Sequence, residues 1–503
     1  MFGLRRIINA IKIQSKKSQD NKSDNTQGKL SRSLPKNVRA IREIMSDSTD
    51  LIIRPLNIGG RKPVKGVLIF IDGLVNAKTI NENIIKPLQY DSRIANADEI
   101  LTGNAEEFMT RMLTVGEVKD ADNLSGVIDG CLQGDSALII DGFCKAFIIN
   151  TKGWDMRSIS EPMTEAVVRG PREGFTENMR TNTALLRRKI KSPDLTFEVM
   201  KIGRRTRTNV CIVYIKSIAD SKLIEEVKRR LSVIDTDAIL ESGYIEQFIE
   251  DSPFSLFATV AYSEKPDVVA AKLLEGRAGI IVDGTPFVLT VHMLFLESFQ
   301  TAEDYYIRTY AASMLRFIRF MAFSISLLAP GFYVALTTYH QELIPTPLLI
   351  SMTSASEGVP FPAVMEVGTM LIVFEILREA GLRMPKPIGQ AISIVGALVV
   401  GEAAVTAGLI SAPIVIVIAV TAVSSFVVPN QYDASSILRI IYLISAAVLG
   451  GFGLALGLLG TLIYLSSLES FSTPYFSPFS PTHAKDLKDS AIRLPLWTMI
   501  TRP

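Results

Sequence analysis

The stretch from Phe320 to Leu468 of this 503-residue chain is mostly apolar, yet three glutamates fall inside its apolar runs. These residues, Glu366, Glu375 and Glu402, stand among prolines and glycines. A carboxylate inside a bilayer costs several kcal/mol, so a plain membrane anchor is not expected to retain three of them. The pattern predicts a polar path, a buried partner or a gate between membrane-embedded helices.

The composition divides the chain into two unlike halves. A mean hydropathy of +0.28 together with 21% charged residues is the average of a polar first part and an apolar second part. The net charge of +2 provides no bulk attraction for a polyanion, so we expect no nucleic-acid partner. The three cysteines form no CxxC pair and indicate buried, unpaired thiols in a reducing compartment.

The first 35 residues are expected to be a disordered, basic and polar tether. In the opening sequence MFGLRRIINAIKI, Arg5, Arg6 and Lys12 interrupt an apolar run that is too short for a signal peptide. Residues 14–33 cannot bury enough apolar surface to offset their chain entropy. Without a signal peptide, we expect the first 300 residues to stay in the cytosol.

The polar half contains two pairs of similar segments. VLIFIDGLVNAKTINENIIKPL begins at Val67 and resembles CIVYIKSIADSKLIEEVKRRL, which begins at Cys211. GDSALIIDGFCKAFII at Gly134 resembles GRAGIIVDGTPFVLTV at Gly276. The offsets of 144 and 142 residues are nearly equal, and each segment alternates short apolar runs with turns or a helical pattern. The repeat predicts two related α/β subdomains.

These subdomains are assigned to residues 36–150 and 208–298, with a basic connector at residues 151–207 between them. The connector is the most basic stretch and includes Arg169 and Arg187. A solvated helix face or a docking surface explains most of its charges, and a site for an anionic ligand or lipid headgroup is the alternative.

Asp72, Asp141 and Asp283 each stand directly before a glycine. Their expected role is turn formation, because glycine accepts positive φ and aspartate bonds its own backbone. The chain contains no GxxxxGK(S/T), HExxH or GxSxG motif, and its three histidines lie in unlike contexts. We therefore predict that the chain is not an enzyme and has no catalytic site, metal or cofactor.

The apolar half, residues 320–470, is predicted to be an all-α polytopic membrane domain that follows a membrane-proximal helix at residues 299–319. Residues 343–356 are too short to cross a bilayer and suit an interfacial or re-entrant segment. The last apolar run has 29 uncharged residues, which as one helix would exceed a ~30 Å hydrocarbon core, so we expect tilt or a break at Gly450-Gly451. The five expected spans are about residues 320–339, 359–377, 388–410, 413–428 and 440–468.

Lysine and arginine gather at alternate connections of this half, which predicts its orientation. Two connections, residues 340–358 and 411–412, contain neither residue type. The positive-inside rule therefore places the polar half in the cytosol. The C-terminal tail, residues 471–503, is ambiguous, because five crossings place it outside whereas its basic residues favour the inside. The basic residues at the other connections are Arg316, Arg319, Arg378, Arg383, Lys386 and Arg439.

The three glutamates are not expected to be equivalent. Glu366 and Glu375 are nine residues apart and so lie on opposite faces of one helix, unless Gly368 marks a break. Glu375 lies near the cytosolic end beside Arg378 and can reach the interface. Glu366 and Glu402 lie deeper, where a pore or gate carboxylate and an interhelical hydrogen bond are equal alternatives. Close helix packing is expected at four glycines: Gly396, Gly401, Gly453 and Gly457.

Five ordered stretches carry a family resemblance that runs from about Ile44 to Tyr475. They are GDSALIIDG at Gly134, EPMTEAVVRGPREGFTEN at Glu161, KPDVVAAKLLEGRAGIIVDGTPFVL at Lys265, ESFQTAEDYYIR at Glu297 and the EGVPFPAVMEVGTM…GEAAV region from Glu357. Together they resemble the A subunit of the GerA-type nutrient germinant receptors of endospore-forming bacteria.

The resemblance implies a function that composition cannot supply. Such subunits reside in the spore inner membrane with a transporter-like B-type subunit and a C-type lipoprotein subunit. They are expected to form a homo-oligomer, as a pentamer, that acts as a ligand-gated cation channel and triggers germination. On this basis Pro360, Pro362 and Gly368 are expected to give local flexibility around Glu366.

Two residues depart from the family pattern, and two rival functions stay open. Lys265 precedes Pro266 where arginine is usual, and Glu402 stands where glutamine is usual, which adds an ionisable group to the membrane. One rival is a paralogous spore membrane channel that aids release of ions or dipicolinate without sensing nutrients. The other is a non-conducting scaffold in which the glutamates join helices.

Overall fold

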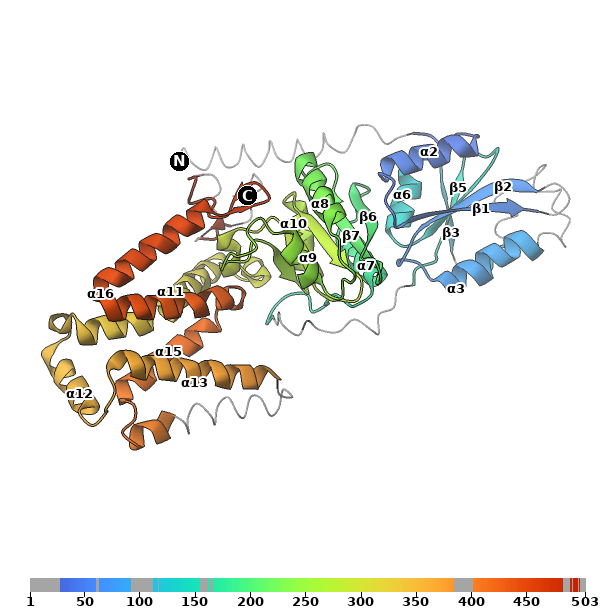
Figure 1. The fold of residues 1–503 in the computed structure, drawn as a ribbon. Coiled ribbons are helices and arrows are strands. Elements are labelled where there is room, and N and C mark those ends of the chain that lie inside the picture. Colours follow the sequence, from blue (N-terminus) through green and yellow to red (C-terminus); the bar gives the residue numbers. More distant parts are fainter. Residues whose placement is uncertain are drawn as a thin grey trace, which may run out of the picture. The chain divides into compact units, whose positions relative to one another are not determined.

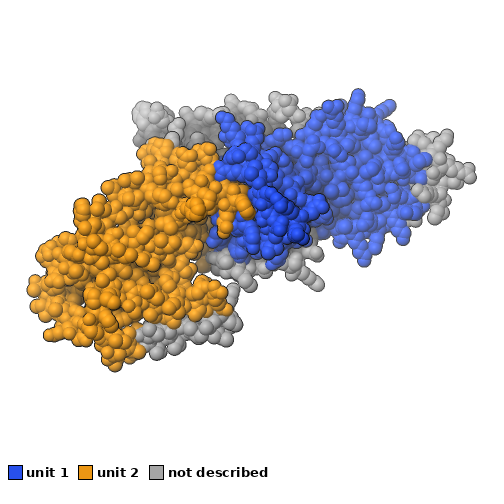
Figure 2. Space-filling view, viewed as in Figure 1, with its two compact units in different colours: residues 1–166, 171–246, 262–290 blue, residues 167–170, 247–261, 291–503 orange. Residues whose placement is uncertain are grey.

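The computed structural model describes residues 28–59, 63–91, 112–115, 117–153, 162, 165, 167–383, 401–482, 489–490, 492–495 and 497. The chain forms two compact units, drawn in blue and orange in Figure 2. Unit 1 comprises residues 1–166, 171–246 and 262–290, and unit 2 comprises residues 167–170, 247–261 and 291–503.

Unit 1 is built on two five-stranded sheets with equivalent strand orders (Figure 1). The first has the order β1-β2-β4-β5-β3, with every neighbouring pair antiparallel. The second has the order β6-β7-β9-β10-β8, and β7 is antiparallel to both of its neighbours. The strands are β1 Leu51–Ile58, β2 Val64–Ile71, β3 Val118–Ala121, β4 Ser136–Ile140, β5 Ala146–Ile149, β6 Leu195–Ile202, β7 Thr208–Ile215, β8 Ala261–Ser263, β9 Ala278–Val282 and β10 Val288–Val291.

The first sheet is covered by helical segments on both faces, which explains its apolar central strands. Successive residues of a strand point to opposite faces, so Ile69 joins a core with α2 and α6, whereas Leu68 joins a core with the segment that follows α3. Every residue of β4 is buried. The helices are α2 Leu34–Ile44, α3 Ala77–Thr79 and α6 Leu124–Leu132.

The second sheet is covered in the same manner. α7 and α10 contribute Leu186 and Leu273 to one core with the strands. α8 buries Ile224, Val227 and Leu231, a spacing that places them on one side of the helix. Unit 1 therefore contains two α/β subdomains, each with one antiparallel sheet. The helices are α7 Met179–Lys189, α8 Ser221–Val233, α9 Ser242–Ile249 and α10 Pro266–Leu274.

The repeat extends to individual hydrogen bonds. Asp141 Oδ1 accepts the Leu34 amide at 3.0 Å at the start of α2, and Asp283 Oδ1 accepts the Met179 amide at 3.1 Å at the start of α7. An aspartate carboxylate is favourable at a helix N-terminus. The Asp-Gly steps at Asp72, Asp141 and Asp283 all lie in turns, as expected, and the turns at Asp141 and Asp283 also present their carboxylates to helices.

The assigned connector contributes regular structure to the second subdomain. α7 and β6 both lie within residues 151–207, and β6 is the edge strand that pairs with β7 from Leu195 to Ile202. The second subdomain therefore begins before residue 208. The sequence did not indicate this earlier start, because α7 ends in Arg187, Arg188 and Lys189, and such a charged end is typical of a solvated helix.

Two further expectations about the first subdomain need correction. The predicted tether reached residue 35, yet Leu30 is buried and Lys29 pairs with Asn123, so residues 28–33 pack on the subdomain. Residues 1–27 lie outside the described residues. Cys144 is exposed, whereas Cys131 and Cys211 are buried as expected.

The two subdomains of unit 1 are joined by a buried ion pair. Arg187 of α7 donates from Nε and Nη2 to Asp50 at 2.9–3.0 Å. The side chain of Arg187 is 0% exposed and that of Asp50 is 6% exposed. The Phe197 amide of β6 donates to Ser48 Oγ, and the Phe197 carbonyl accepts hydrogen bonds from the amide and the hydroxyl of Thr49. The pair is costly to break, because removing one partner leaves the other charge buried.

Unit 2 is helical in its apolar part. Two of its described helical stretches, Thr309–Thr338 and Pro429–Ser467, are long and apolar enough to cross a membrane, and Ala412–Ser425 is a shorter apolar helix. Most of the expected third span, residues 388–410, lies outside the described residues. The helices are α11 Thr309–Thr338, α12 Thr346–Ser356, α13 Ala363–Arg383, α15 Ala412–Ser425 and α16 Tyr432–Ser467, with a further helical segment from Gly401.

α16 folds back on itself at Gly450. This glycine has φ 58° and ψ −140°, and Figure 1 shows the two halves of α16 meeting at an angle. The Tyr442 hydroxyl in the first half lies 2.7 Å from Thr461 Oγ1 in the second, so the halves lie side by side. The expected break at Gly450-Gly451 is confirmed, and the chain returns to the side on which α16 began.

This hairpin determines the side of the C-terminal tail. Gln431, at the start of α16, donates to Ser298 at 2.7 Å and to the Tyr475 hydroxyl at 3.5 Å. The tail therefore leaves the helices at the same end as the first turns of α11 and α16. The count of five crossings had placed the tail on the opposite side because it treated residues 440–468 as one pass.

Candidate functional site

Glu366 joins the first turn of α13 to the start of α15. Its side chain is buried, and its Oε2 accepts the Ser411 amide at 2.8 Å. Ser411 is the N-cap residue of α15. Two helix N-termini thus meet at one carboxylate. The interhelical hydrogen bond that the sequence left as one alternative is present.

Glu375 faces the first turns of α16. It accepts hydrogen bonds from the Tyr432 hydroxyl at 2.5 Å and from Ser436 Oγ at 3.3 Å. Arg378 lies 3.8 Å away and places its guanidinium 3.0 Å from the centre of the Tyr432 ring. α13 runs through Gly368 without a break, so Glu366 and Glu375 use opposite faces, toward α15 and α16.

Arg439 is the residue of this cluster that sequence reasoning missed. Its side chain is buried, its Nε donates to the Ser326 carbonyl of α11 at 2.8 Å, and its Nη1 lies 3.5 Å from Glu375 Oε1. The sequence pattern assigns it to the connection before the last span. The signal was its sequence context, because Ile437 to Ile441 is otherwise entirely apolar. Arg439 connects α11, α13 and α16 through one guanidinium.

Glu402 has a different environment from the other two glutamates. It lies in the helical segment that begins at Gly401, and its side chain is exposed. The structure therefore places one candidate gate residue inside the helical bundle and the other on its surface. Pro360 and Pro362 are exposed and precede α13, and the Pro362 carbonyl accepts the amides of Met365 and Glu366.

The packing glycines of α16 act within its own hairpin. A Cβ on Gly453 would collide with the Ser445 carbonyl, and a Cβ on Gly457 would approach the Tyr442 ring to 2.6 Å. Both contacts join the two halves of α16, where only glycine permits the approach. Gly401 is buried, and a Cβ added to it would lie 3.3 Å from the Val415 side chain. Gly396 lies outside the described residues.

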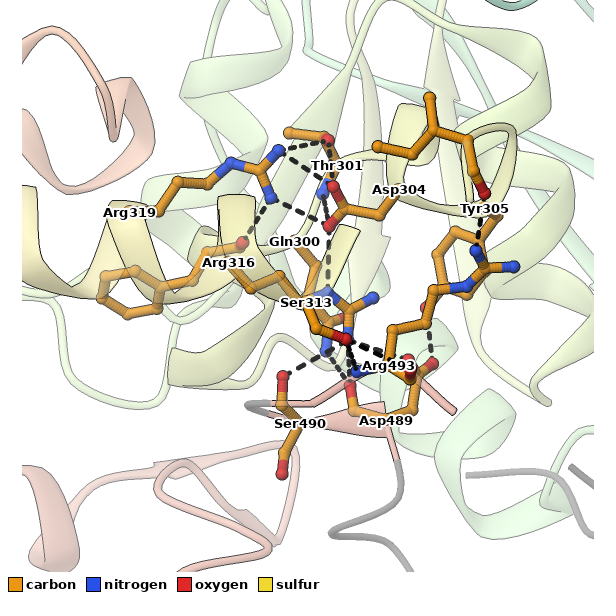
Figure 3. A network of polar contacts seen from close by, with 12 residues as sticks. Gln300, Thr301, Asp304, Tyr305, Ser313, Arg316, Arg319, Asp489, Ser490 and Arg493 are labelled. Atoms are coloured by element: carbon orange, nitrogen blue, oxygen red, sulfur yellow. Dashed lines mark hydrogen bonds and ion pairs between the residues drawn. The ribbon is translucent and has the colours of Figure 1, made fainter. Parts of the chain in front are cut away.

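A second polar network lies at the membrane-proximal end of α11 (Figure 3). Asp304 accepts from Arg316 Nε at 3.0 Å and from Arg319 Nη1 at 2.8 Å. Asp304 and Arg316 are both 0% exposed. Burial by itself would raise the pKa of Asp304, but the hydrogen bonds from the two arginines outweigh it and hold the pKa below its ordinary value.

The C-terminal tail completes this network. Asp489 accepts from Arg316 Nη1 at 2.8 Å and from the Tyr305 hydroxyl at 2.5 Å (Figure 3). Arg493 exchanges hydrogen bonds with Ser313 through its backbone and donates from Nη1 to the Ile307 carbonyl at 2.9 Å. Burial and the neighbouring Asp489 raise the pKa of Tyr305. The C-terminal tail therefore binds the first turns of α11. No local sequence pattern predicts this contact.

Comparisons with known proteins give the chain a consistent set of relatives. A family described as Bacillus/Clostridium GerA spore germination protein matches residues 39–503. The chain is 46% identical to spore germination protein KA of Bacillus subtilis (strain 168), over 94% of this chain and 87% of that protein. It is 38% identical to spore germination protein GerLA of Bacillus cereus, over 93% and 94%.

Two further similar proteins are a membrane protein and a solved structure. An uncharacterized membrane protein of Bacillus subtilis (strain 168), YfkQ, is 42% identical over 95% of this chain and 92% of its own length. Among solved structures, the N-terminal domain of the A subunit of the Bacillus megaterium spore germinant receptor GerK3 is 37% identical. It covers 53% of this chain and 97% of its own, with a TM-score of 0.41.

Proposed function

Because this chain belongs to the GerA spore germination protein family as a receptor A subunit, we propose that it is a subunit of an oligomeric, ligand-gated cation channel. The channel resides in the spore inner membrane, as a pentamer, with the polar half in the cytosol. A transporter-like B-type subunit and a C-type lipoprotein subunit assemble with it, and nutrient binding on the B-type subunit opens the channel.

The observation that carries this proposal is the exposed carboxylate of Glu402 in the apolar half of the chain. An ionisable group that faces lipid is costly, and such groups in membrane proteins face a partner or a water-filled path. Since Glu402 is exposed on a single copy, a second subunit or a path between subunits supplies its polar surroundings. An assembled channel provides both.

Gating requires contacts that differ between two states. Glu366 holds the start of α15, and Glu375 with Arg439 holds the start of α16. Both contacts are made by α13, so a shift of α13 changes them together. A ligand can favour one state only by its differential affinity, so the nutrient-binding subunit must contact the helices in both states.

Ion flux through reconstituted oligomers tests the proposal. Glu402→Gln is expected to change cation flux or its ion preference by several-fold, and Glu366→Gln is expected to change gating. Glu342→Gln is the matched control, because this glutamate is exposed beside His340 in the connection after α11. Flux and germination unchanged in both variants would remove the pore and gate assignments.

A non-conducting scaffold is the second candidate. It is favoured by the satisfied contacts of Glu366 and Glu375, which join helices as interhelical polar links do. The complete receptor in liposomes separates the two, since a channel conducts cations when nutrient is added and a scaffold does not. A third candidate, a paralogous channel for ion or dipicolinate release, predicts flux that does not respond to nutrients when the B-type and C-type subunits are present.

A further inference from the structure

A turn between α9 and β8 exposes an aromatic side chain. Phe254 is 99% exposed, the largest exposed fraction of any aromatic residue in the described part of the chain. Residues 252–255 belong to unit 2 and are here called the Phe254 turn. A single exposed apolar side chain is ordinary on a surface in water, so the level at which Phe254 lies decides its role.

The segment around the Phe254 turn is fixed to the end of α16 at two points. On one side of the turn, Asp251 Oδ2 accepts the Phe471 amide at 2.6 Å. On the other side, the Thr259 carbonyl accepts the Ser470 hydroxyl at 2.6 Å. α16 ends at Ser467, so residues 251–259 lie where the second half of α16 leaves the apolar part of unit 2.

The ring of Phe257 relates the turn to the long apolar helices. It lies 6.2 Å from the Tyr464 ring, in the last turn of α16, and 5.9 Å from the Phe295 ring. Phe295 in turn lies 6.1 Å from the Phe323 ring of α11. The segment that carries the Phe254 turn is therefore level with Phe323 and Tyr464.

This level is a boundary of the hydrocarbon core. The uncharged part of α11, from Phe320 to Thr338, is about 28 Å long, close to the ~30 Å thickness of a hydrocarbon core. Phe323 lies in the first turn of that part. Phe254 is three residues from Phe257 and so lies at most about 11 Å from it. The exposed ring is within reach of the acyl chains.

The backbone of the Phe254 turn enters a headgroup region at low cost. The Ser252 carbonyl accepts the Ser255 amide at 2.9 Å, and Ser255 Oγ accepts the Phe257 amide at 3.1 Å. Pro253 carries no amide hydrogen. Residues 252–255 carry no charge. Because polar backbone groups without partners oppose insertion into lipid, these internal hydrogen bonds suit the turn to a membrane surface.

We propose that the Phe254 turn inserts its ring into the bilayer, at the boundary between the headgroups and the acyl chains, and anchors the chain just before β8 to the membrane. The end of α16 exposes Leu462 and Ile463, so the apolar outer surface of α16 reaches the level of the turn. The ring continues this surface onto chain that lies outside the long helices. The contact requires only a membrane and goes beyond the channel proposal.

The size and chemistry of the turn favour lipid over a protein partner. A standard protein interface buries about 800 Å² on each side, far more than four residues present. Contact with acyl chains requires no matching shape, and an aromatic ring is a usual anchor at a membrane interface. The turn carries no basic residue, so the contact does not depend on an anionic headgroup.

Fluorescence quenching in liposomes tests the insertion. Full-length A subunit with Cys144→Ser and Phe254→Cys is labelled with a bimane thiol reagent, since Cys131 and Cys211 are buried. Lipid brominated near the glycerol is expected to lower the emission at least twofold, and more than lipid brominated near the chain ends. Aqueous iodide is expected to have little effect. The matched control is Val233→Cys on α8 in the same background, an apolar residue that is 70% exposed in unit 1, and iodide alone should quench it.

Two results of this experiment would overturn the proposal. Quenching of the Phe254→Cys label by iodide and not by brominated lipid would place the turn in water. Protection from both quenchers would place it against protein, either a second copy or another subunit. Because Phe254 makes so little contact with its own chain, the cysteine variant is expected to keep the thermal midpoint of the parent protein.

Photolabelling provides a measurement on the wild-type chain in the complete receptor. A phospholipid that carries a diazirine close to the glycerol is activated in the membrane, and labelled peptides are identified by mass spectrometry. The peptide that contains Phe254 is expected to carry at least tenfold more lipid adduct than the peptide that contains Val233. Equal labelling of the two peptides would contradict the insertion. Neither measurement uses ion flux, so the insertion and the channel proposal can fail separately.

Discussion

Arg316 and Asp489 are 173 residues apart in sequence, yet Arg316 Nη1 lies 2.8 Å from Asp489 Oδ1 and 2.6 Å from the Asp489 carbonyl oxygen. The C-terminal tail thereby neutralises a buried guanidinium at the base of the first long apolar helix. Asp304 supplies the second carboxylate, so the polar side of α11 is held from two directions. These ion pairs therefore fix the rotation of α11 about its axis.

Asp304 gives the protein a pH dependence of predictable sign. Its pKa is held below the unfolded value of about 3.9, so its contribution to stability is complete above about pH 4 and is lost as the pH falls through its folded pKa. Asp304→Asn should lower the thermal midpoint at pH 7, and the difference from the wild type should shrink as the pH approaches 3. Thermal unfolding in detergent at pH 7, 5, 4 and 3 measures this. A difference that is constant with pH contradicts it, and Glu342→Gln serves as the control.

The Arg187–Asp50 pair should be one of the most sensitive contacts in unit 1. Asp50→Asn leaves Arg187 buried without a charge partner and should cost about 3–5 kcal/mol of unfolding free energy. Arg180→Ala removes an exposed pair with Asp72 at 3.2 Å and should cost at most about 1 kcal/mol. Chemical denaturation of the two variants gives the comparison, and equal effects would show that the buried pair is not required to hold the subdomains.

Alanine variants of Gly73 and Gly142 distinguish the cost of backbone strain from the cost of a disturbed contact between the subdomains. Both have positive φ, at 84° and 90°, so alanine strains each by about 1–2 kcal/mol. An added Cβ on Gly73 would also lie 3.0 Å from Ala184 Cβ, whereas nothing lies within 4 Å of one on Gly142. Gly73→Ala should therefore destabilise more than Gly142→Ala in the same denaturation assay. A larger loss in Gly142→Ala would mean that α7 does not pack tightly on Gly73.

The Glu375–Arg439 contact predicts non-additive mutations. Glu375→Gln leaves the buried Arg439 without its carboxylate and should cost about 3 kcal/mol, whereas Glu375→Gln with Arg439→Met should recover part of that loss. Thermal unfolding of the two single variants and the double variant in detergent measures the coupling. Glu379→Gln is the control, because Glu379 pairs with Arg383 on an exposed face of the same helix. Strict additivity would show that the two residues act independently.

Patterns that repeat locally made much of the fold predictable. The offset between the segments at Gly134 and Gly276 indicated two related subdomains, and both Asp-Gly steps became turns. The double glycine at residue 450 indicated where a 29-residue apolar run would break. In each case the physical cause acts within a few residues, through side-chain alternation or glycine's tolerance of positive φ.

The site was less predictable because its contacts are distant in sequence. Glu366 and Glu375 were recognised from their cost in an apolar segment, but Ser411, Tyr432 and Arg439 were not identified as their partners. Helical spacing places residues on a face, and it does not tell which helix that face meets. β6 was missed for the same reason, since an edge strand is defined by its neighbour.

The amino-acid sequence by itself determined the polar and apolar halves, the repeat, the membrane glutamates and the family. Each of these features depends on residue types and on patterns within short segments. The cost of burying a side chain and the geometry of the backbone relate such patterns directly to structure. Only the tertiary structure decided the side of the tail, the partner of each buried charge and the rotation of α11 about its axis. Those features arise when Asp489, Asp304 and Arg316 meet, and a contact between residues so far apart exists only once the whole chain has packed.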